Sequence, residues 1–246
     1  MQKTREELKQ LYVIDDAHAY MQVIDERDKN HAFYPFYLRQ ISRLKHLLPL
    51  LPTGGELDVI DIGCGNGLLA DLIAKNVKTY TGVDFSKEFI EIAKVRHNAL
   101  GNENTHFHCS DIVEFSQDMK YRKKFNVCFA MDFTEHVYDD QLVEIFTAAT
   151  NMLKDDGKLV IHTPNANFLL EILKNKGIMT QLEGHIGVRK DKELIKLFSK
   201  AGFEAEKINY LAHYNKLLRP WHLLSRVPLI GKLFEARLLM QFKKTP

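Results

Sequence analysis

The stretch VIDIGCGNG, which runs from Val59 to Gly67, decides the fold of this chain. A β-branched, apolar run typical of a buried strand leads into three glycines that alternate with other residues, and a helical pattern of apolar residues follows. Glycine adopts positive φ at low cost and leaves the backbone bare, so a ligand can lie directly against such a turn. The stretch therefore predicts a strand, a ligand-binding loop and a helix.

The spacing of the glycines excludes the two common phosphate-binding loops. The dinucleotide fingerprint is G-x-G-x-x-G, with a pyrophosphate at the helix N-terminus. Here Gly67 comes one residue early, and Leu68 stands where the third glycine is expected. No Lys-Ser or Lys-Thr follows, as a P-loop requires. Asp61 precedes the loop, and an acid suits a ligand with a cationic amine better than a diphosphate.

Strand-like and helix-like segments alternate along the chain around this loop. Strands are predicted over 57–62, 79–83, 105–109, 125–130, 158–162, 203–210 and 236–242, and helices over 4–24, 31–48, 68–75, 87–100, 141–153 and 191–201, with a turn at 155–157. This alternation predicts a parallel sheet with helices on both faces, and the last two strands are expected to pair antiparallel at its edge. Ligands on such sheets bind at the carboxyl ends of the strands.

Acidic residues follow the next two predicted strands, just as Asp61 ends the first. Asp84 can accept hydrogen bonds from both hydroxyls of a ribose, and Phe85 can lie against an adenine ring. Asp111 can accept from the adenine amine while Ile112 covers the ring. Each acid alone is equally well explained as a loop residue, but three in register predict a nucleoside-bearing ligand.

The motifs DIGCGNG, GVDFS and SDI together resemble those of the class I S-adenosylmethionine (SAM)-dependent methyltransferases, over roughly residues 31–212. The resemblance implies an α/β fold, a Rossmann-like seven-stranded sheet of order 3-2-1-4-5-7-6, and SAM as the cofactor. It also implies that Gly63 and Gly65 line the methionine portion, that Asp61 holds its ammonium group through water, and that Asp84 binds the ribose.

The same resemblance assigns the remaining cofactor contacts. Phe85 and Ile112 would sandwich the adenine, and Asp111 would bind its amine. Met131, after the fourth predicted strand, would touch the methionine portion. Arg39, on the helix before the glycine loop, is a candidate for the carboxylate of SAM, with a solvated helix face as the alternative.

The acceptor site is expected after the fourth and fifth strands. Glu135-His136 resembles the E-H-V element of the ubiquinone-biosynthesis O-methyltransferases, and T-P-N at 163–165 and E-G-H-I at 183–186 resemble that group too. SAM carries its own leaving group, so the enzyme must align the acceptor and, for a hydroxyl, remove a proton. We predict Glu135 and His136 as catalytic residues, with His136 as the base; a role in bracing the turn is the alternative.

A metal site is an alternative at the same place. Some relatives use E-x-x-E-H to bind a divalent ion, and this chain has Asp132, Glu135 and His136, with His185 downstream. Two carboxylates and an imidazole suit Mg²⁺ or Mn²⁺. Because Asp replaces the first Glu and has a shorter reach, we predict no metal ligands, and His185 as a lid or substrate residue.

The charges are unevenly spread over the chain. Of 34 basic and 32 acidic residues, residues 213–246 hold seven bases and one acid, which leaves a mildly acidic body. Within 214–234 these bases alternate with aromatics and leucines. Two interpretations stay open: peripheral membrane contact, or a substrate-side cap that packs Leu217, Leu218, Leu223, Leu224 and Leu229 onto the domain. No RNA-binding motif accompanies the bases, so nucleic acid is not an expected partner.

We expect three regions: an N-terminal helical cap (1–52), a SAM-binding core (53–212), and a basic apolar cap segment with the last strand of the same domain (213–246). Three cysteines without a CxxC pair argue against a disulfide framework, and the charged N-terminus lacks the apolar stretch of a secretory signal. These features predict a cytoplasmic protein, membrane-associated if the basic segment meets a bilayer.

The sequence thus predicts a SAM-dependent methyltransferase that acts on a small, lipophilic or glycan-linked acceptor, with O-methylation favoured. An RNA 2′-O-methyltransferase and a SAM-binding scaffold protein without catalysis are the alternatives.

Overall fold

The computed structural model describes residue 7, residues 23–182 and residues 184–245 of the chain. Almost all of the helix predicted over 4–24 lies outside these residues. The described part of the predicted cap holds the short 3-10 helices η2 (Glu26–Asp28) and η3 (Leu48–Leu50), with helix α2 (Tyr34–Lys45) between them.

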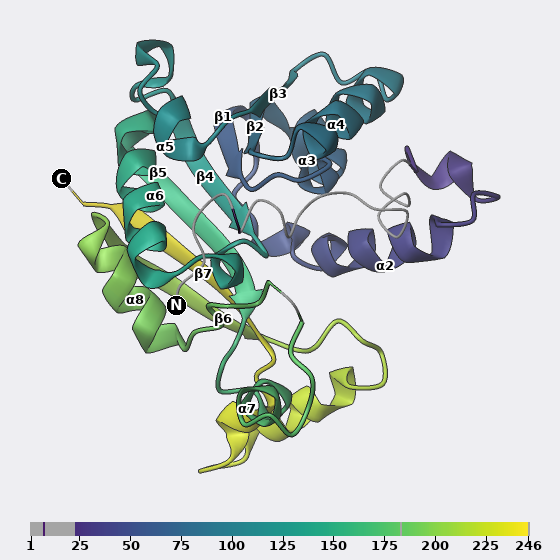
Figure 1. The fold of residues 1–246 in the computed structure, drawn as a ribbon, viewed down its shortest axis with the longest axis vertical. Coiled ribbons are helices and arrows are strands. Elements are labelled where there is room, and N and C mark those ends of the chain that lie inside the picture. The colour runs from purple at the N-terminus through teal and green to yellow at the C-terminus, as the bar shows by residue number, and fades with distance from the viewer. Residues whose placement is uncertain (1–6, 8–22, 183, 246) are drawn as a thin grey trace.

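A seven-stranded sheet runs through the centre of the molecule (Figure 1). Its strands are β1 (Gly54–Ile62), β2 (Val77–Asp84), β3 (Thr105–Cys109), β4 (Phe125–Met131), β5 (Leu153–Pro164), β6 (Phe203–Leu211) and β7 (Arg237–Lys244). Their spatial order is β3-β2-β1-β4-β5-β7-β6. The strands from β3 to β5 pair in parallel, whereas β7 is antiparallel to both β5 and β6. The predicted fold and strand order are confirmed.

Helices cover both faces of the sheet (Figure 1). On one face lie α2, α3 (Leu68–Ile73) and α4 (Lys87–Ala99), and on the other α5 (Ile112–Phe115), α6 (Asp139–Met152) and α8 (Asp191–Lys200). Successive side chains of a strand point to opposite faces, so in β4 Val127 and Phe129 join one core while Cys128 and Ala130 join the other. Strands buried on both faces are the pattern of a covered parallel sheet.

Short elements complete the chain: η4 (Ala74–Asn76), η5 (Met119–Tyr121), η6 (Thr134–His136), α7 (Leu169–Asn175), η7 (Arg219–Arg226) and η8 (Gly231–Phe234). No helix among the described residues is both long and apolar enough to cross a membrane.

A buried ion pair fastens the N-terminal region to the core. Arg96 of α4 is 1% exposed; its guanidinium pairs with Asp71 of α3 and donates to the carbonyl of Val23. The buried cation thus has both a carboxylate and a backbone partner, which is the condition for tolerating a charge inside a protein. Val23 in turn packs with Tyr37 and Ile41 of α2, so α2 is held beside the glycine loop.

The turn predicted at 155–157 is wrong, because those residues lie within β5. Helix α6 ends at Met152, and the next residue, Leu153, is already extended and pairs with Phe125 of β4. The buried side chain of Leu153 therefore starts the strand before the turn-like residues are reached.

The prediction that segment 214–234 packs its leucines onto the domain is also wrong. Leu217, Leu223 and Leu229 are 83%, 70% and 104% exposed. The segment folds instead into η7 and η8, which pack on each other through Trp221 and Phe234, with ring centroids 6.3 Å apart. That packing leaves Leu217, Leu223, Leu224 and Leu229 exposed, whereas Leu218 is half-buried.

We expect Phe198→Ala to lower the free energy of unfolding by about 3–5 kcal/mol, because it empties a fully buried site. The Phe198 ring of α8 lies 4.9 Å from the Phe146 ring of α6 and 4.7 Å from the Phe242 ring of β7. Urea unfolding followed by circular dichroism measures the loss. The exposed Val95→Ala variant is the control and should change stability by less than about 0.5 kcal/mol; equal effects of the two variants would contradict this packing.

Candidate functional site

A cavity of about 380 Å³ opens at the carboxyl ends of β1, β2 and β4. Its size falls within the range of small-molecule sites, about 300–1,000 Å³. Nine of the eleven residues predicted for the site line it, and Glu135 and Arg39 do not. The nine are Asp61, Gly63, Gly65, Asp84, Phe85, Asp111, Ile112, Met131 and His136.

The glycine loop presents bare backbone to this cavity. Gly63 and Gly65 have φ values of 69° and 51°, in the region that favours glycine. A Cβ at Gly63 would collide with the ring of Phe133, whereas a Cβ at Gly65 would meet nothing within 4 Å. The space above Gly65 is therefore open for a ligand to approach the main chain.

Two carboxylates are oriented by backbone N–H groups at the cavity edge. Asp84 accepts from the N–H of Gly65 at 3.0 Å and from that of Ser86 at 2.9 Å. Burial raises the pKa of Asp84, and these hydrogen bonds oppose the rise. Asp111 caps α5 by accepting from the Val113 N–H at 2.8 Å. Both carboxylates are thus fixed in place beside the cavity.

Asp61 is the most deeply buried acid of the cavity, at 2% exposure. The Tyr80 hydroxyl donates to its Oδ2 atom, while Oδ1 is buried and has no hydrogen-bond partner among the described residues. Burial raises the pKa of Asp61 to about 7; the Tyr80 hydrogen bond opposes this rise and nearby Asp84 adds to it. A buried acceptor without a donor is costly, so this site suits a ligand that brings an ammonium group.

The structure does not bring Arg39 to the cavity; Arg43, one helical turn later, lines it. Arg39 is exposed and lies over the Phe36 ring at 5.0 Å. It is two residues from both Tyr37 and Ile41, the buried positions of α2, which puts it on the opposite helix face. Arg43 is the residue that sequence reasoning missed. It comes four residues after Arg39 and lies on nearly the same helix face, so no local pattern distinguishes the two. It is the only Lys or Arg among the described residues that line the cavity.

His136 ends η6, the turn that follows β4, and lines the cavity. Its Nδ1 is 3.1 Å from the carbonyl oxygen of Gly184, so we assign Nδ1–H as donor to that oxygen. Burial lowers the pKa of His136, which keeps the imidazole neutral at pH 7. The His185 ring packs edge-on against it, with centroids 5.0 Å apart, and burial together with His136 lowers the pKa of His185 to about 4.

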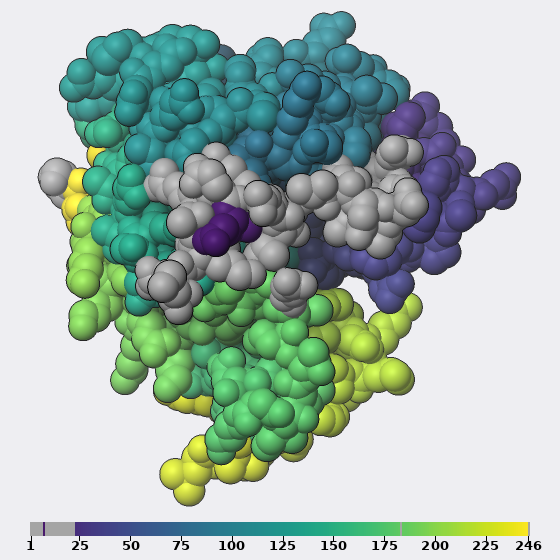
Figure 2. Space-filling view, in the orientation of Figure 1, coloured from purple at the N-terminus to yellow at the C-terminus, as the bar shows by residue number. Residues whose placement is uncertain are grey.

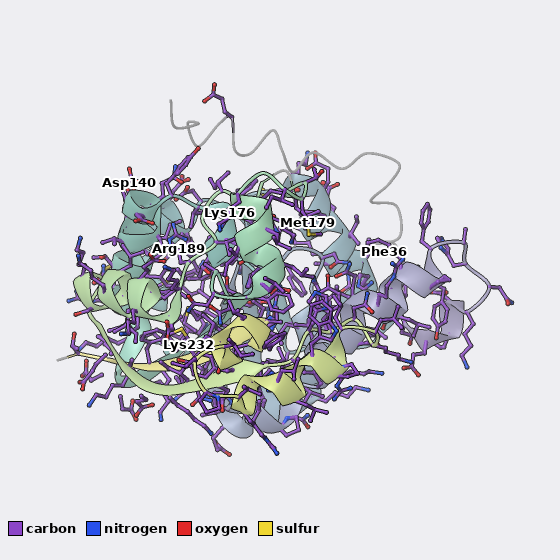
Figure 3. The ribbon with its side chains drawn as sticks, turned by 90° about the horizontal axis from the view of Figure 1, so that it is seen from below. Phe36, Asp140, Lys176, Met179, Arg189 and Lys232 are labelled. Atoms are coloured by element: carbon purple, nitrogen blue, oxygen red, sulfur yellow. The ribbon has the colours of Figure 1, made fainter. Side chains whose placement is uncertain are left out.

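Arg189, labelled in Figure 3, holds this turn in shape. Its guanidinium donates to the carbonyls of Thr134, Val137 and Gly187 at 2.6–2.8 Å, and to the carboxylate of Asp139 at 2.7 Å. One buried cation thus ties the turn that carries His136 to the chain just beyond His185.

Glu135 is 1% exposed, and its carboxylate accepts a hydrogen bond from the Thr163 hydroxyl at 3.1 Å. Burial raises the pKa of Glu135 to about 7. One ligand atom each from Glu135, His136 and His185 lies within 4.8 Å of the others. Asp132 does not join this group, because its carboxylate is bound by Arg237. A metal ion here would thus find one carboxylate and two imidazoles, a set that suits Mn²⁺ or Zn²⁺ better than Mg²⁺.

A family model described as a methyltransferase domain matches residues 14–208. The chain belongs to this SAM-dependent methyltransferase family. The ubiquinone biosynthesis O-methyltransferase of Coxiella burnetii (strain Dugway 5J108-111) is 35% identical over 134 residues, which are 54% of each chain. That of Thiobacillus denitrificans (strain ATCC 25259 / T1) is 25% identical over 203 residues, 80% of this chain and 84% of the relative. The chain matches about half the length of the first of these relatives.

Solved methyltransferase structures share the fold. A SAM-dependent methyltransferase from Archaeoglobus fulgidus has a TM-score of 0.62 and 19% identity, over 87% of this chain and 100% of that one. Geranyl diphosphate C-methyltransferase from Streptomyces coelicolor A3(2), solved with Mg²⁺, geranyl diphosphate and S-adenosylhomocysteine, has a TM-score of 0.59 and 15% identity, over 83% and 78% of the two chains. The predicted family resemblance and the SAM cofactor are confirmed, while the roles of individual residues stay predictions.

We expect the affinity for S-adenosylhomocysteine to rise by roughly tenfold per pH unit between pH 5.5 and 7, and to level off above pH 7. The reason is that Asp61, with a pKa of about 7, must lose its proton to attract the ligand's ammonium group. Isothermal titration calorimetry in two buffers of different ionisation enthalpy measures the affinity and the proton released. Asp61→Asn should abolish both the pH dependence and the proton release; their persistence in this variant would refute the assignment.

Proposed function

We propose that the protein transfers the methyl group of SAM to a hydroxyl group of a small, lipophilic acceptor. The observation that carries the proposal is a single cavity that joins the glycine loop and the acids at the carboxyl ends of β1, β2 and β3 to His136. The residues proposed to bind the cofactor and the residue proposed as the base therefore line the same cavity. The O-methyltransferase activity named for the 35% identical relative supports a hydroxyl as the acceptor group.

The cofactor side would hold both ends of SAM. SAM supplies a methyl group on a positively charged sulfur. Asp84 and Asp111 are oriented to accept from the ribose and the adenine amine, while Asp61 and Arg43 offer opposite charges to the amino acid end. Hydrogen bonds at the nucleoside end and opposite charges at the amino acid end restrict the orientation of SAM. This restriction lowers the entropic cost of methyl transfer.

His136 would act as the general base. The neutral ring that donates through Nδ1 to Gly184 carries its lone pair on Nε2, and that atom can take the proton of an acceptor hydroxyl. The guanidinium of Arg189 donates to backbone carbonyls of the turn that carries His136, which keeps the base in one position. Glu135, hydrogen-bonded to Thr163, supports the turn from below.

We expect His136→Ala to lower kcat by about 10²–10⁴-fold on a phenolic acceptor identified by screening, with little change in the KM for SAM, because only proton removal is lost. The exposed His106→Ala on β3 is the matched control and should keep full activity. Full turnover by His136→Ala would remove the base assignment.

The same assay, run after dialysis against EDTA, separates this mechanism from a metal-assisted one. The base mechanism retains activity. A loss that Mn²⁺ restores would instead favour a metal held by Glu135, His136 and His185.

We further propose that the acceptor is reached from an anionic membrane. A basic apolar surface is formed by the end of α7 with the loop after it and by η7 and η8, which lie together at one end of the molecule (Figures 1 and 2). Lys176 and Met179 lie on the first part and Lys232 on the second (Figure 3). No acid occurs in 172–182 or 214–234. The exposed residues of this surface include apolar Ile178, Leu182, Leu217, Leu223 and Leu229, and basic Lys176, Lys216, Arg219, Arg226 and Lys232.

Exposed leucines among bases suit the interface of an anionic bilayer, where apolar burial and attraction to acidic lipids add together. The surface also adjoins the cavity. The Tyr214 ring at its edge lies 5.5 Å from the guanidinium carbon of Arg43, and Gly184, just after its loop, contacts His136. A lipophilic acceptor could thus pass from bilayer to cavity without crossing water.

We expect the protein to float with vesicles of phosphatidylcholine and phosphatidylglycerol (7:3) and not with phosphatidylcholine alone. Replacing Leu217, Leu223 and Leu229 together by Ser should reduce binding by about tenfold or more, because their apolar surface is then lost to the bilayer. The control replaces Val95 and Met119 by Ser. These residues are also exposed, at 64% and 68%, but lie outside this surface, so the change should leave binding unaltered. Equal flotation of both variants, or none by the wild type, would contradict the membrane proposal.

A further inference from the structure

Asp132 lies at the centre of an ionic cluster drawn from four elements. It directly follows β4, and the Arg237 guanidinium at the start of β7 donates to its Oδ1 atom. The His162 Nδ1 atom of β5 lies 2.8 Å from the same oxygen. The Arg43 Nη2 atom of α2 lies 3.1 Å from the other oxygen, Oδ2. The carboxylate thus connects the neighbouring strands β4, β5 and β7 to helix α2.

The backbone of Asp132 is strained into this position. Its φ is 53°, a left-handed conformation that costs a non-glycine residue about 1–2 kcal/mol. The Asp132 N–H donates to the carbonyl of His162 at 2.7 Å, which holds the residue there. Strain of this kind persists only where surrounding contacts enforce it, and here they fix the carboxylate against the two arginines.

The charges of the cluster do not cancel. Burial, together with Arg43, lowers the pKa of His162 to about 3, so the imidazole is neutral. Its Nδ1–H then donates to Asp132, and its Nε2 faces the Arg237 Nε at 3.4 Å. One carboxylate therefore meets two guanidinium groups, and one unit of positive charge is left over at the cavity wall.

Only part of this cluster faces the cavity. Arg43 and Asp132 both line it, whereas Arg237 and His162 do not. The Nε of Arg43 is buried and has no hydrogen-bond partner among the described residues. Arg43 is thus paired through one end of its guanidinium only. Its remaining donors can therefore serve a carboxylate in a cavity whose other charged lining residues are aspartates.

We propose that Asp132 is a positioning residue, which holds Arg43 in the orientation that receives the carboxylate of SAM. Arg237 and His162 fix Asp132, so the setting of Arg43 depends on β5 and β7 as well as on α2. An arginine side chain is long and flexible, and Tyr214 offers it a competing place to stack. The inference rests on the proposed function, because it takes the SAM carboxylate as the ligand of Arg43.

The test compares two ligands that differ only in the carboxylate: S-adenosylhomocysteine and S-adenosyl-3-thiopropylamine. The wild-type protein should bind the first more tightly by about tenfold or more, as for a hydrogen bond between charged groups. Arg43→Ala should bring this ratio of Kd values close to 1. Asp132→Asn should lower the ratio to within about threefold of 1 and leave the Kd of the amine nearly unchanged. The double variant should show no further loss, because the two residues act as one unit.

His162→Phe is the milder variant; it removes one donor to Asp132 and should give an intermediate ratio, so it carries the test if Asp132→Asn fails to fold. Asp58→Asn is the matched control. Asp58 of β1 is also a buried carboxylate and pairs with Lys78 of β2 at 3.6 Å. Removing its charge should leave the ratio of the two Kd values unchanged. Melting temperatures show that each variant is folded.

The outcomes separate the two levels of the proposal. No binding of either ligand by folded wild-type protein overturns the proposed function itself. An unchanged ratio in Arg43→Ala overturns the carboxylate site, and the positioning role with it. A ratio that collapses in Arg43→Ala but is kept in Asp132→Asn overturns the positioning role alone. A higher ratio in Asp132→Asn does so too, because Asp132 would then compete with the ligand for Arg43. Equal weakening of both ligands by Asp132→Asn would leave Asp132 a purely structural role.

Discussion

The hydrogen bond from the Gly65 N–H to the carboxylate of Asp84 is the contact on which the cofactor side depends. It joins the loop after β1 to the end of β2, and it forms only because glycine lets the loop turn with positive φ. With these two strand ends locked, the parallel sheet brings Asp61, Asp84 and Asp111 to one edge. The space that they enclose is open above Gly65. The arrangement of the glycine loop, the three aspartates and the cavity thus depends on the turn at Gly65 and on the carboxylate of Asp84.

The side of the cavity that we propose for the acceptor is built differently, from segments that are distant in sequence. The turn that bears His136 is clamped by Arg189, which comes from the chain before α8. Its histidine contacts Gly184, in the loop that leaves α7. Variation in these late segments can therefore change the acceptor without disturbing the SAM site. This division explains how one fold serves many acceptors, since the chemistry resides in loops carried by a rigid scaffold.

Electrostatics tie the two sides together. The cavity is lined by four aspartates and one arginine, and burial raises the pKa of Asp61 to about 7. A zwitterionic amino acid end with an additional cationic sulfur complements such a lining. Asp132, which we propose positions this arginine, has partners on β5 and β7. On that proposal, β7 contributes to the binding of the cofactor.

The sequence by itself determined the sheet, the glycine loop and the acids at the strand ends, because these depend on local spacing. A buried strand followed by glycines and an acid can be read without knowing its neighbours, and nine of the eleven residues predicted for the site line one cavity. Only the tertiary structure decided which turn of α2 meets that cavity, and so replaced Arg39 by Arg43. It alone joined Asp132 to Arg237, which is 105 residues away, and left Leu229 exposed. Contacts between distant residues are set by packing in three dimensions, and no local pattern encodes them.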